Sequence, residues 1–560
     1  MNIIILLAGI CFAQNVDNDV LLKAMVDELN VSYEKLKNAQ EHQLYFIGYE
    51  AWVNDNYFLS SKLGAVLNED EDKTSYLTCD IRIGTPSLDS THEIKTTDRQ
   101  QYYKNNSSRQ NIVLVSLNDY DAIRTQIWNI TDETYKSALN RYIKVLSNKN
   151  ITAEEEDKSG DFITNVKYDV FYSTTTKENI DKEKIKSFMK EISAYFKKYD
   201  FIIDSAVGFL AKNVSRYIVN SDGARIVEGT KKYRIYYYIT SRTDDGLDLS
   251  RFRSYEFENI NEIPSKEKII SDMDVSVREI KELLNAPNLE PYSGPVIMEA
   301  KASGVFWHEI FGHRVEGHRQ KIEQSGQTFA KKIGEKIMPD FLSIYDDPNL
   351  KYYKGRFLNG YYLYDDEGVK SQKAELVDKG VLKGFLMQRV PVRGFNQSNG
   401  HGRRSPGYIT VARQGNLIVE SSKTVSYEEL KKMLIDEVKK SGKEYGLIIK
   451  DIEGGYTITT RDLPQSYSIL VKYAVKIYPD GKEVPVRGFN IVGTPLNTFP
   501  NIIATANDFD VFNGMCGAES GWVDVSAVSP SILFKTMETE KVQKSNQKPP
   551  VLKPPFFDKD

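Results

Sequence analysis

The spacing of apolar residues predicts helices and strands in alternation through the first half of the chain. Helical spacing recurs at residues 20–37, 119–146, 181–199 and 266–284. Strand-like patterns lie between them, at residues 45–53, 58–67, 75–83, 215–219 and 233–241. The acidic run 68–72 is expected to be the turn that joins the second and third of these strands in a hairpin. The pattern therefore predicts an α+β domain over residues 14–289.

The pattern changes after residue 289. A short apolar strand at residues 295–300 leads into a histidine-rich segment, and glycine-punctuated strands follow to about residue 534. Hairpin turns are predicted at residues 378–380 and 479–481. We expect a β-rich C-terminal domain over residues 290–539 that carries one important helix. The remainder, residues 540–560, is rich in Lys, Gln and Pro and is expected to be a flexible tail.

The heptapeptide Val-Pro-Val-Arg-Gly-Phe-Asn occurs twice, at residues 390–396 and 484–490. One explanation is a duplicated β layer with two equivalent bends, each with Pro at a strand edge and Gly at a turn. The simpler explanation is a turn solution that both segments share without a functional role.

Composition narrows the class of protein. At 560 residues the chain is too long for one hydrophobic core, and its formal net charge of -4 gives no broad field for nucleic acid or anionic lipid. Residues 1–13 form an apolar run that ends at a small residue, which is typical of a signal peptide cleaved after Ala13. A lipoprotein signal at Cys11 is the alternative, although Ile10 suits it poorly. We therefore expect an exported protein, periplasmic or extracellular, without integral membrane contact.

Residues 307–319 read Trp-His-Glu-Ile-Phe-Gly-His-Arg-Val-Glu-Gly-His-Arg and contain three of the six histidines. In zinc peptidases with two histidines four positions apart on a helix, the glutamate after the first histidine is the general base. Here His308 and His313 are five positions apart, so a regular helix would hold their rings roughly 140° apart. A π-bulge with Gly312 at the distortion would bring both rings to one side. Coincidental surface or core histidines are the alternative.

Cys516, in the glycine-rich segment 512–517, is a candidate third ligand. A catalytic zinc takes three protein ligands and keeps an open position for water, and a thiolate binds zinc well. His318 competes for this role, but it lies five residues beyond His313 and would need a second distortion. A buried small hydrophobe is the other role for Cys516. It could also form a bridge with Cys79, the other cysteine left after cleavage.

Further motifs accompany this segment along the chain. They are Val315-Glu316-Gly317, Asp365-Asp366-Glu367-Gly368, Leu382-Lys383-Gly384, Gly400-His401-Gly402-Arg403-Arg404, Gly454-Gly455 and Met515-Cys516-Gly517, with a weaker echo at residues 216–223. Taken in order, they make the chain from about residue 124 to 539 resemble the TldD/PmbA family of metallopeptidases, also called the modulator of DNA gyrase family. The resemblance is to its metal-bearing, TldD-like side.

The resemblance implies that residues 290–539 form a metallopeptidase domain. His308, His313 and Cys516 would hold one Zn²⁺ per subunit, and Glu309 would be the general base. It also implies a two-domain subunit that dimerises around a central cavity and takes unfolded or extended peptides as a β-strand. Family members are usually cytosolic, and many work with a metal-free sister subunit. Export of this chain favours a homodimer over such a heterodimer.

Four further residues are candidates for substrate binding. Arg403 and Arg404 could hold the substrate or the oxyanion, or form only a solvated basic turn. Gly454 and Gly455 would let a peptide backbone approach a sheet edge. The expected function is zinc-dependent hydrolysis of unfolded peptides by a water that Glu309 activates. The alternatives are a non-catalytic partner subunit and a metal hydrolase with a non-peptide substrate.

Overall fold

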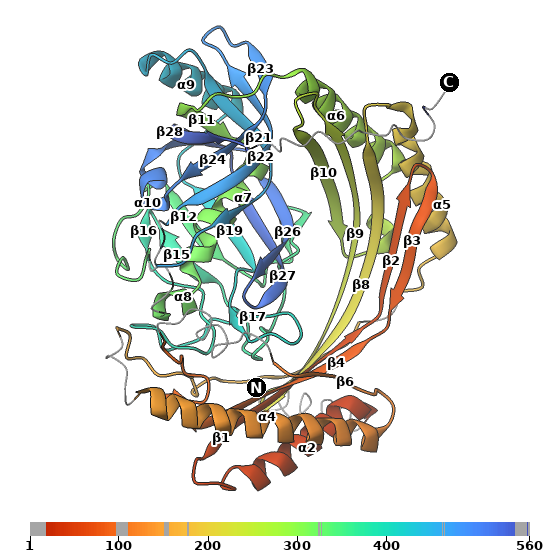
Figure 1. Cartoon of the computed structure of the whole chain (residues 1–560), viewed down its shortest axis with the longest axis vertical. Coiled ribbons are helices and arrows are strands. Elements are labelled where there is room, and N and C mark those ends of the chain that lie inside the picture. The colour runs from red at the N-terminus through yellow and green to blue at the C-terminus, as the bar shows by residue number, and fades with distance from the viewer. Residues whose placement is uncertain are drawn as a thin grey trace, which may run out of the picture.

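A computed structural model describes residues 18–96, 110–149, 156–175, 178–322, 325, 328–461, 463, 465–543 and 557. Within these ranges the chain forms three large sheets of ten, eight and six strands, together with helices that cover them (Figure 1). This mixture agrees with the predicted α+β class. The segment 1–13, for which we predict a signal peptide, and most of the C-terminal tail lie outside the described residues.

The ten-stranded sheet belongs to the N-terminal half, and its order is β10-β9-β8-β1-β4-β5. Its two longest strands, β8 (Asp204–Asn220) and β9 (Arg225–Arg242), curve from the end beside α4 to the end beside α6 (Figure 1). The other strands are β1 (Leu44–Asn54), β2 (Asn56–Lys62), β3 (Ala65–Asp72), β4 (Ser75–Thr85), β5 (Leu88–Asp89), β6 (Ile112–Leu114), β7 (Val170–Ser173) and β10 (Asp248–Phe257). The helices are α2 (Val20–Leu36), α4 (Tyr120–Lys149), α5 (Lys182–Ser193) and α6 (Lys266–Asn285). All lie close to the predicted bounds except α5, which ends at Ser193 and continues as a 3₁₀ turn, η1 (Ala194–Lys198).

The hairpin predicted around the acidic run 68–72 is wrong. The chain turns earlier, at Leu63 and Gly64, whose φ angles are 47° and 80°. Two consecutive positive φ angles define the two-residue turn that suits the twist of a hairpin. The acidic residues instead belong to β3, an exposed edge strand, where charge discourages pairing with another chain.

The C-terminal half contains the other two large sheets. The eight-stranded sheet consists of β11 (Ser293–Met298), β20 (Thr424–Val425), β21 (Gly446–Thr457), β22 (Tyr467–Ile477), β23 (Glu483–Val486), β24 (Phe489–Gly493), β25 (Ile502–Ala506) and β28 (Ile532–Lys541). The six-stranded sheet consists of β12 (Leu342–Asp346), β15 (Ala374–Asp378), β16 (Val381–Leu382), β19 (Asn416–Ser421), β26 (Asp510–Ala518) and β27 (Gly521–Ser529). Two short ribbons pair β13 (Tyr352–Tyr353) with β14 (Arg356–Phe357), and β17 (Gly402–Arg403) with β18 (Val411–Ala412). Because β28 includes residues 540 and 541, the tail begins later than residue 540.

The helix that follows β11, α7 (Ala300–Ile310), lies between these two sheets and packs on β21, β26 and β27. Its side chains are apolar and buried on nearly every face. Gly304 permits the close contact with β27, since a Cβ there would lie 3.0 Å from the carbonyl oxygen of Ala527. Trp307 stacks on Phe499 at a centroid distance of 5.4 Å. The helix is therefore fixed along its length. The other C-terminal helices are α8 (His318–Lys321), α9 (Tyr427–Lys440) and α10 (Pro495–Thr498).

The two copies of the heptapeptide share a turn but not a setting. Gly394 and Gly488 have φ angles of 83° and 77°, which favour glycine in both. The first copy closes a tight turn through the bridge between Val392 and Phe395, whereas the second connects β23 to β24. A common turn explains the repeat, and the copies do not form equivalent layers of a sheet.

One apolar cluster draws side chains from both halves of the chain. Val207 of β8 and Ile280 of α6 are buried in the same cluster as Ile448 of β21 and Leu533 of β28. The boundary predicted at residue 289 stays a prediction, but the core on its two sides is continuous.

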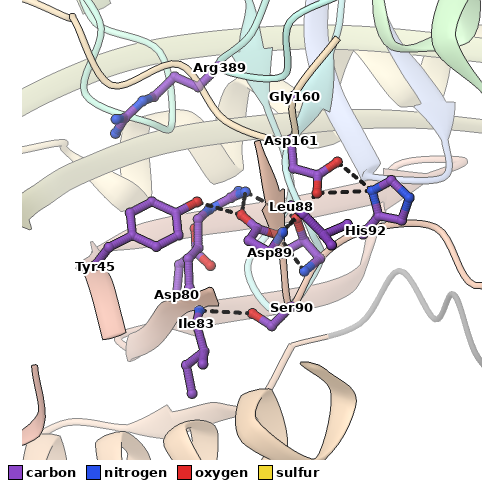
Figure 2. Close-up of polar contacts among 12 residues, drawn as sticks. Tyr45, Asp80, Ile83, Leu88, Asp89, Ser90, His92, Gly160, Asp161 and Arg389 are labelled. Atoms are coloured by element: carbon purple, nitrogen blue, oxygen red, sulfur yellow. Dashed lines mark hydrogen bonds and ion pairs between the residues drawn. The ribbon is translucent and has the colours of Figure 1, made fainter. Parts of the chain in front are cut away.

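A polar cluster lies beside the N-terminal sheet (Figure 2), and Lys321, from the chain that follows the histidine segment, reaches it. Asp161 lies at its centre, with Oδ1 2.8 Å from His92 Nδ1 and Oδ2 accepting from the backbone N–H of Asp89 at 2.9 Å. Tyr45 donates to the carboxylate of Asp89 at 2.5 Å. Lys321 of α8 reaches Asp161 Oδ1 at 3.5 Å. These contacts fix α8 against the N-terminal half.

No helix in the described part of the chain combines the length and the apolar character needed to traverse a bilayer. Cys79 and Cys516 are both buried and free, so the bridge that we considered between them is absent.

Candidate metal centre

His308, His313 and Cys516 come together at the end of α7. Their ligand atoms all lie within 4.8 Å of one another, and all three residues are buried. Cys516 Sγ is 3.3 Å from His313 Nε2, and the two imidazole centroids are 5.0 Å apart. Cys516 belongs to β26, the edge strand of the six-stranded sheet, and α7 packs directly against that strand. Packing of the helix on this edge therefore brings the thiol to the imidazoles across 203 positions of sequence.

The structure contradicts the predicted π-bulge. α7 ends at Ile310, Phe311 has φ -106° and ψ -53°, and the chain continues as a 3₁₀ turn, η3 (Gly312–Val315). The backbone N–H of Arg314 donates to Phe311 at 2.9 Å, the shorter span of a 3₁₀ turn. The two histidines therefore stand on different helical segments, and a break between the segments turns His313 toward His308.

Gln414 completes the end of α7. The backbone carbonyl of His308 accepts a hydrogen bond of 3.2 Å from Gln414 Nε2, which satisfies one of the free carbonyls at a helix C-terminus. The Gln414 side chain occupies the space beside Gly312, since a Cβ there would lie 1.9 Å from Gln414 Oε1. Gly312 is thus needed for room rather than for an unusual backbone angle. The sequence showed the glycine but gave no signal for its partner.

The imidazoles favour the thiolate form of Cys516. Burial alone would raise the pKa of the thiol, but His313 and His308 hold it well below its ordinary value. Burial likewise opposes the charged form of His313, whereas Cys516 and Glu316 raise the pKa of its imidazole well above the usual range. A thiolate is the form of cysteine that binds metal ions.

Glu309 lies beside the three residues. Its Oε2 is 4.0 Å from His313 Nε2, and burial raises the pKa of its carboxyl, against the pull of His308 and His313. Gly455 of β21 packs against it, because a Cβ there would lie 3.3 Å from Glu309 Cγ. The carboxylate is therefore held between the imidazoles and the backbone of β21.

A second layer of charged residues, to which the sequence assigned no role, orients this group. Glu316 Oε1 lies 3.1 Å from His313 Nδ1, and Glu316 Oε2 accepts from Arg319 at 2.7 Å. Burial would raise the pKa of Glu316, but His313, Arg319 and Arg413 bring it down to about 2. Arg413, fully buried, donates to the Cys516 carbonyl at 2.8 Å and lies 3.5 Å from Glu316. A carboxylate that holds the second nitrogen of a histidine ligand is common at metal sites.

The competing ligand, His318, is directed elsewhere. Its Nε2 lies 2.6 Å from Glu519 Oε1, and Arg319 donates to the other oxygen of Glu519 at 2.9 Å. His318 therefore belongs to the ion-pair layer behind the three residues.

The candidate substrate residues are placed in different surroundings. Arg403 donates to the carbonyls of Gln414 and Asp524, both at 2.7 Å. Arg404 is buried and pairs with Glu50 of β1 at 2.5 Å, so it ties the two halves together. Among the described residues, neither arginine contacts His308, His313 or Cys516. Gly455 lies at the site, and a Cβ on Gly454 would meet open space.

The three donors suit a metal ion. Two imidazoles and a thiolate are the ligand types of catalytic zinc sites. His308 Nδ1 is buried without a hydrogen-bond partner among the described residues, and such an unpaired polar atom is costly in a protein interior. The chemistry of this donor set thus fits zinc.

Comparisons with known proteins relate the chain to metallopeptidases. Residues 291–541 match the family model described as the PmbA/TldA metallopeptidase C-terminal domain. A curated metalloprotease of Archaeoglobus fulgidus is 28% identical over 275 residues, 48% of this chain and 59% of that protein. A zinc metalloprotease TldD homolog of Saccharolobus solfataricus is 22% identical over 325 residues, 58% of this chain and 68% of that protein. TldE from Thermococcus kodakarensis has a similar structure, with a TM-score of 0.58 at 15% identity over 92% of this chain and 99% of that chain.

The last likeness shows the fold alone, and the chain spans under two thirds of the Archaeoglobus relative, 59% of its length. Fold and site together define a member of a metallopeptidase family. Residues 291–541 match the C-terminal domain of this family, and the relatives and the fold support a TldD/PmbA family member, as the motifs predicted.

Proposed function

We propose that this protein is a zinc-dependent peptidase of the TldD type that hydrolyses unfolded or extended peptides. The observation that carries the proposal is the convergence of His308, His313 and Cys516 within 4.8 Å. In this proposal the three residues hold one Zn²⁺ per subunit. When bound, zinc lowers the pKa of water and polarises a carbonyl group.

Glu309 is the proposed general base. Its carboxylate accepts a proton from the attacking water and delivers it to the leaving amine. One proton thus passes from water to amine, and Glu309 ends in the form in which it began. Glu316 keeps the His313 ring in position through Nδ1, and Arg413 fixes the backbone of Cys516. These contacts hold the donors before substrate arrives, so little reorganisation is needed during the reaction.

The edge of β21 is the proposed substrate-binding strand. Its pairing with β11 stops at Ile449, while its pairing with β22 continues to Thr457. Among the described residues, no strand pairs with the other edge of β21 beyond Ile449. The exposed side chain of Tyr456 and the open space at Gly454 leave this edge accessible next to Glu309. An extended peptide can add a strand there through backbone hydrogen bonds, which demand little of its sequence.

Assembly and location complete the proposal. We propose a homodimer, with a heterodimer that includes a metal-free sister subunit as the alternative, and export guided by residues 1–13. Size measurement of the purified protein and N-terminal sequencing of secreted material test these two points.

The test of the function compares Glu309→Gln with the unaltered protein on a denatured protein substrate and on its native form. We expect stoichiometric zinc in both proteins, cleavage of the denatured substrate only, and a loss of about 10²-fold or more in kcat/KM for the variant. Glu375→Gln, at an exposed position of β15, is the matched control. Purified protein without zinc would favour a partner subunit, and zinc without peptide cleavage would favour another hydrolase.

A further inference from the structure

A cavity of about 410 Å³ lies at the opposite end of α7 from the three donors. Glu299, Ala300 and Lys301 at the start of α7 line it. Arg251, Arg253 and Glu279 line it from the N-terminal half, and the remaining lining comes from Tyr427, Lys450, Asp451, residues 508–510 and Ser531. The cavity therefore spans the junction of the two halves.

Three elements run from this cavity to the metal centre. α7 begins at Ala300 in the cavity wall and ends beside His308, a length of about 15 Å at 1.5 Å per residue. β21 passes from Lys450 and Asp451 in the wall to Gly455 against Glu309. β26 begins at Asp510 in the wall and reaches Cys516 six residues later. A peptide laid along the free edge of β21 with its cleaved bond at Glu309 would reach the cavity after about four to five residues, at ~3.3 Å each.

The carboxylates in the wall already have partners. Glu279 accepts a hydrogen bond of 2.7 Å from Arg251 Nε, and Asp451 Oδ2 lies 2.7 Å from Arg251 Nη1 in an ion pair. Glu299 accepts from Tyr427 at 2.7 Å. Asp508 accepts from Ser531, and Asp510 lies 3.2 Å from Arg356.

Two positively charged side chains of the wall, Arg253 and Lys301, have N–H donors that are not used in close ion pairs with described residues. Within the described part of the chain, Arg253 forms no ion pair, and its one contact with a side-chain oxygen is a 3.4 Å bond to Ser276. Lys301 forms a long ion pair of 3.6 Å with Asp451, whose carboxylate is already paired with Arg251. The N-terminus of α7 opens into the same cavity without a side-chain cap, and its dipole favours an anion. The wall carries five carboxylates and four cations, and within the described residues Arg253 and Lys301 are the cations of the wall without an ion pair shorter than 3.6 Å.

The direction of β21 determines which end of a bound peptide lies at the cavity. β21 runs away from the cavity toward Glu309, so a peptide paired antiparallel to it points its C-terminal part at the cavity. Antiparallel pairs are the more stable and the more common arrangement. We propose that the cavity binds a carboxylate of the substrate about four to five residues C-terminal to the cleaved bond. This inference rests on the proposed peptidase function.

The carboxylate could be the C-terminus of the peptide or an Asp or Glu side chain. The experiment uses the full-length zinc-containing protein and one peptide sequence whose cleavage site is mapped by mass spectrometry. The peptide is shortened to end two to eight residues after the cut, each length as free acid and as amide. A further amidated peptide carries Asp at the fifth position.

We expect kcat/KM for the acid to exceed that for the amide by about tenfold, the ratio for one charge-assisted hydrogen bond, only when the peptide ends four or five residues after the cut. If Asp at the fifth position raises kcat/KM of the amidated peptide to that of the acid, the site accepts any carboxylate. If it does not, the site is specific for the C-terminus. In Arg253→Gln the ratio should fall to near one. Arg242→Gln, which removes an arginine of β9 outside the cavity, should keep it.

Equal rates for acid and amide at every length would overturn the inference while leaving the peptidase function intact. So would a preference that survives Arg253→Gln in a protein with unchanged melting temperature. Dependence on a free N-terminus at that distance would instead show parallel binding and an amine site at the acidic residues. Failure to cleave any peptide would refute the proposed function itself, and this inference with it.

Discussion

Gly312→Ala tests how the end of α7 is built. The added methyl would lie 1.9 Å from Gln414 Oε1, and Gln414 is only 1% exposed, so its side chain has no solvent to move into. Overpacking of this kind costs about 1–3 kcal/mol. Displacing Gln414 also leaves the His308 carbonyl without its donor, which costs about 1–3 kcal/mol more. We expect a loss of about 2–4 kcal/mol in the free energy of unfolding, because partial relaxation offsets part of the sum.

The same displacement loosens His308 relative to His313. Zinc affinity should therefore fall by about 10–100-fold, as it does when outer contacts of a metal site are lost. The assays are urea unfolding and competition for zinc with a coloured chelator. Gly454→Ala, whose methyl meets open space, is the stability control. In the double variant with Gln414→Ala the clash is gone, so part of the lost stability should return. An unchanged unfolding midpoint and zinc affinity in Gly312→Ala, or a double variant less stable than the single one, would refute this reasoning.

Two further predictions concern the thiol and a buried carboxylate. Cys516→Ala should fold but retain far less than one zinc per chain after dialysis, and full zinc content by atomic absorption would exclude the thiol as a ligand. Burial disfavours the ionised form of Asp524, but Lys232, 3.3 Å away, and further cations keep the pKa of Asp524 below the usual range. Burial also lowers the pKa of Lys232. The stabilisation from ionised Asp524 should be present at neutral pH and disappear as pH falls below about 4, the unfolded pKa. The melting-temperature difference between the natural protein and Asp524→Asn should shrink over that range, and a constant difference would contradict the assignment.

Regular elements with long periodic patterns were predictable from the sequence. α4 and α6 lie within a few residues of their predicted bounds because their apolar spacing persists for several turns. The first hairpin was not predictable, because the acidic run 68–72 suggested a turn more strongly than did Leu63 and Gly64, which form the turn. Composition marks a turn only statistically, whereas two positive φ angles fix one.

The candidate donors were predictable for a different reason. His308, His313 and Cys516 are residue types with few roles in an interior, so chemistry singled them out before their positions were known. The π-bulge was wrong because spacing alone shows that a helix must deviate, without showing whether it bends or ends. Gln414 and Arg413 could not be predicted, since only tertiary packing brings their polar groups to His308 and Cys516.

The apolar cluster shared by β8, α6, β21 and β28 has a consequence for how the molecule holds its shape. Each half also has an apolar cluster of its own, but this third cluster draws on both, so each half gains part of its stability from contact with the other. Separation of the halves would expose the apolar side chains of this cluster to water. We therefore expect the distance from the proposed carboxylate site to Glu309 to stay fixed, because motion between the halves is opposed.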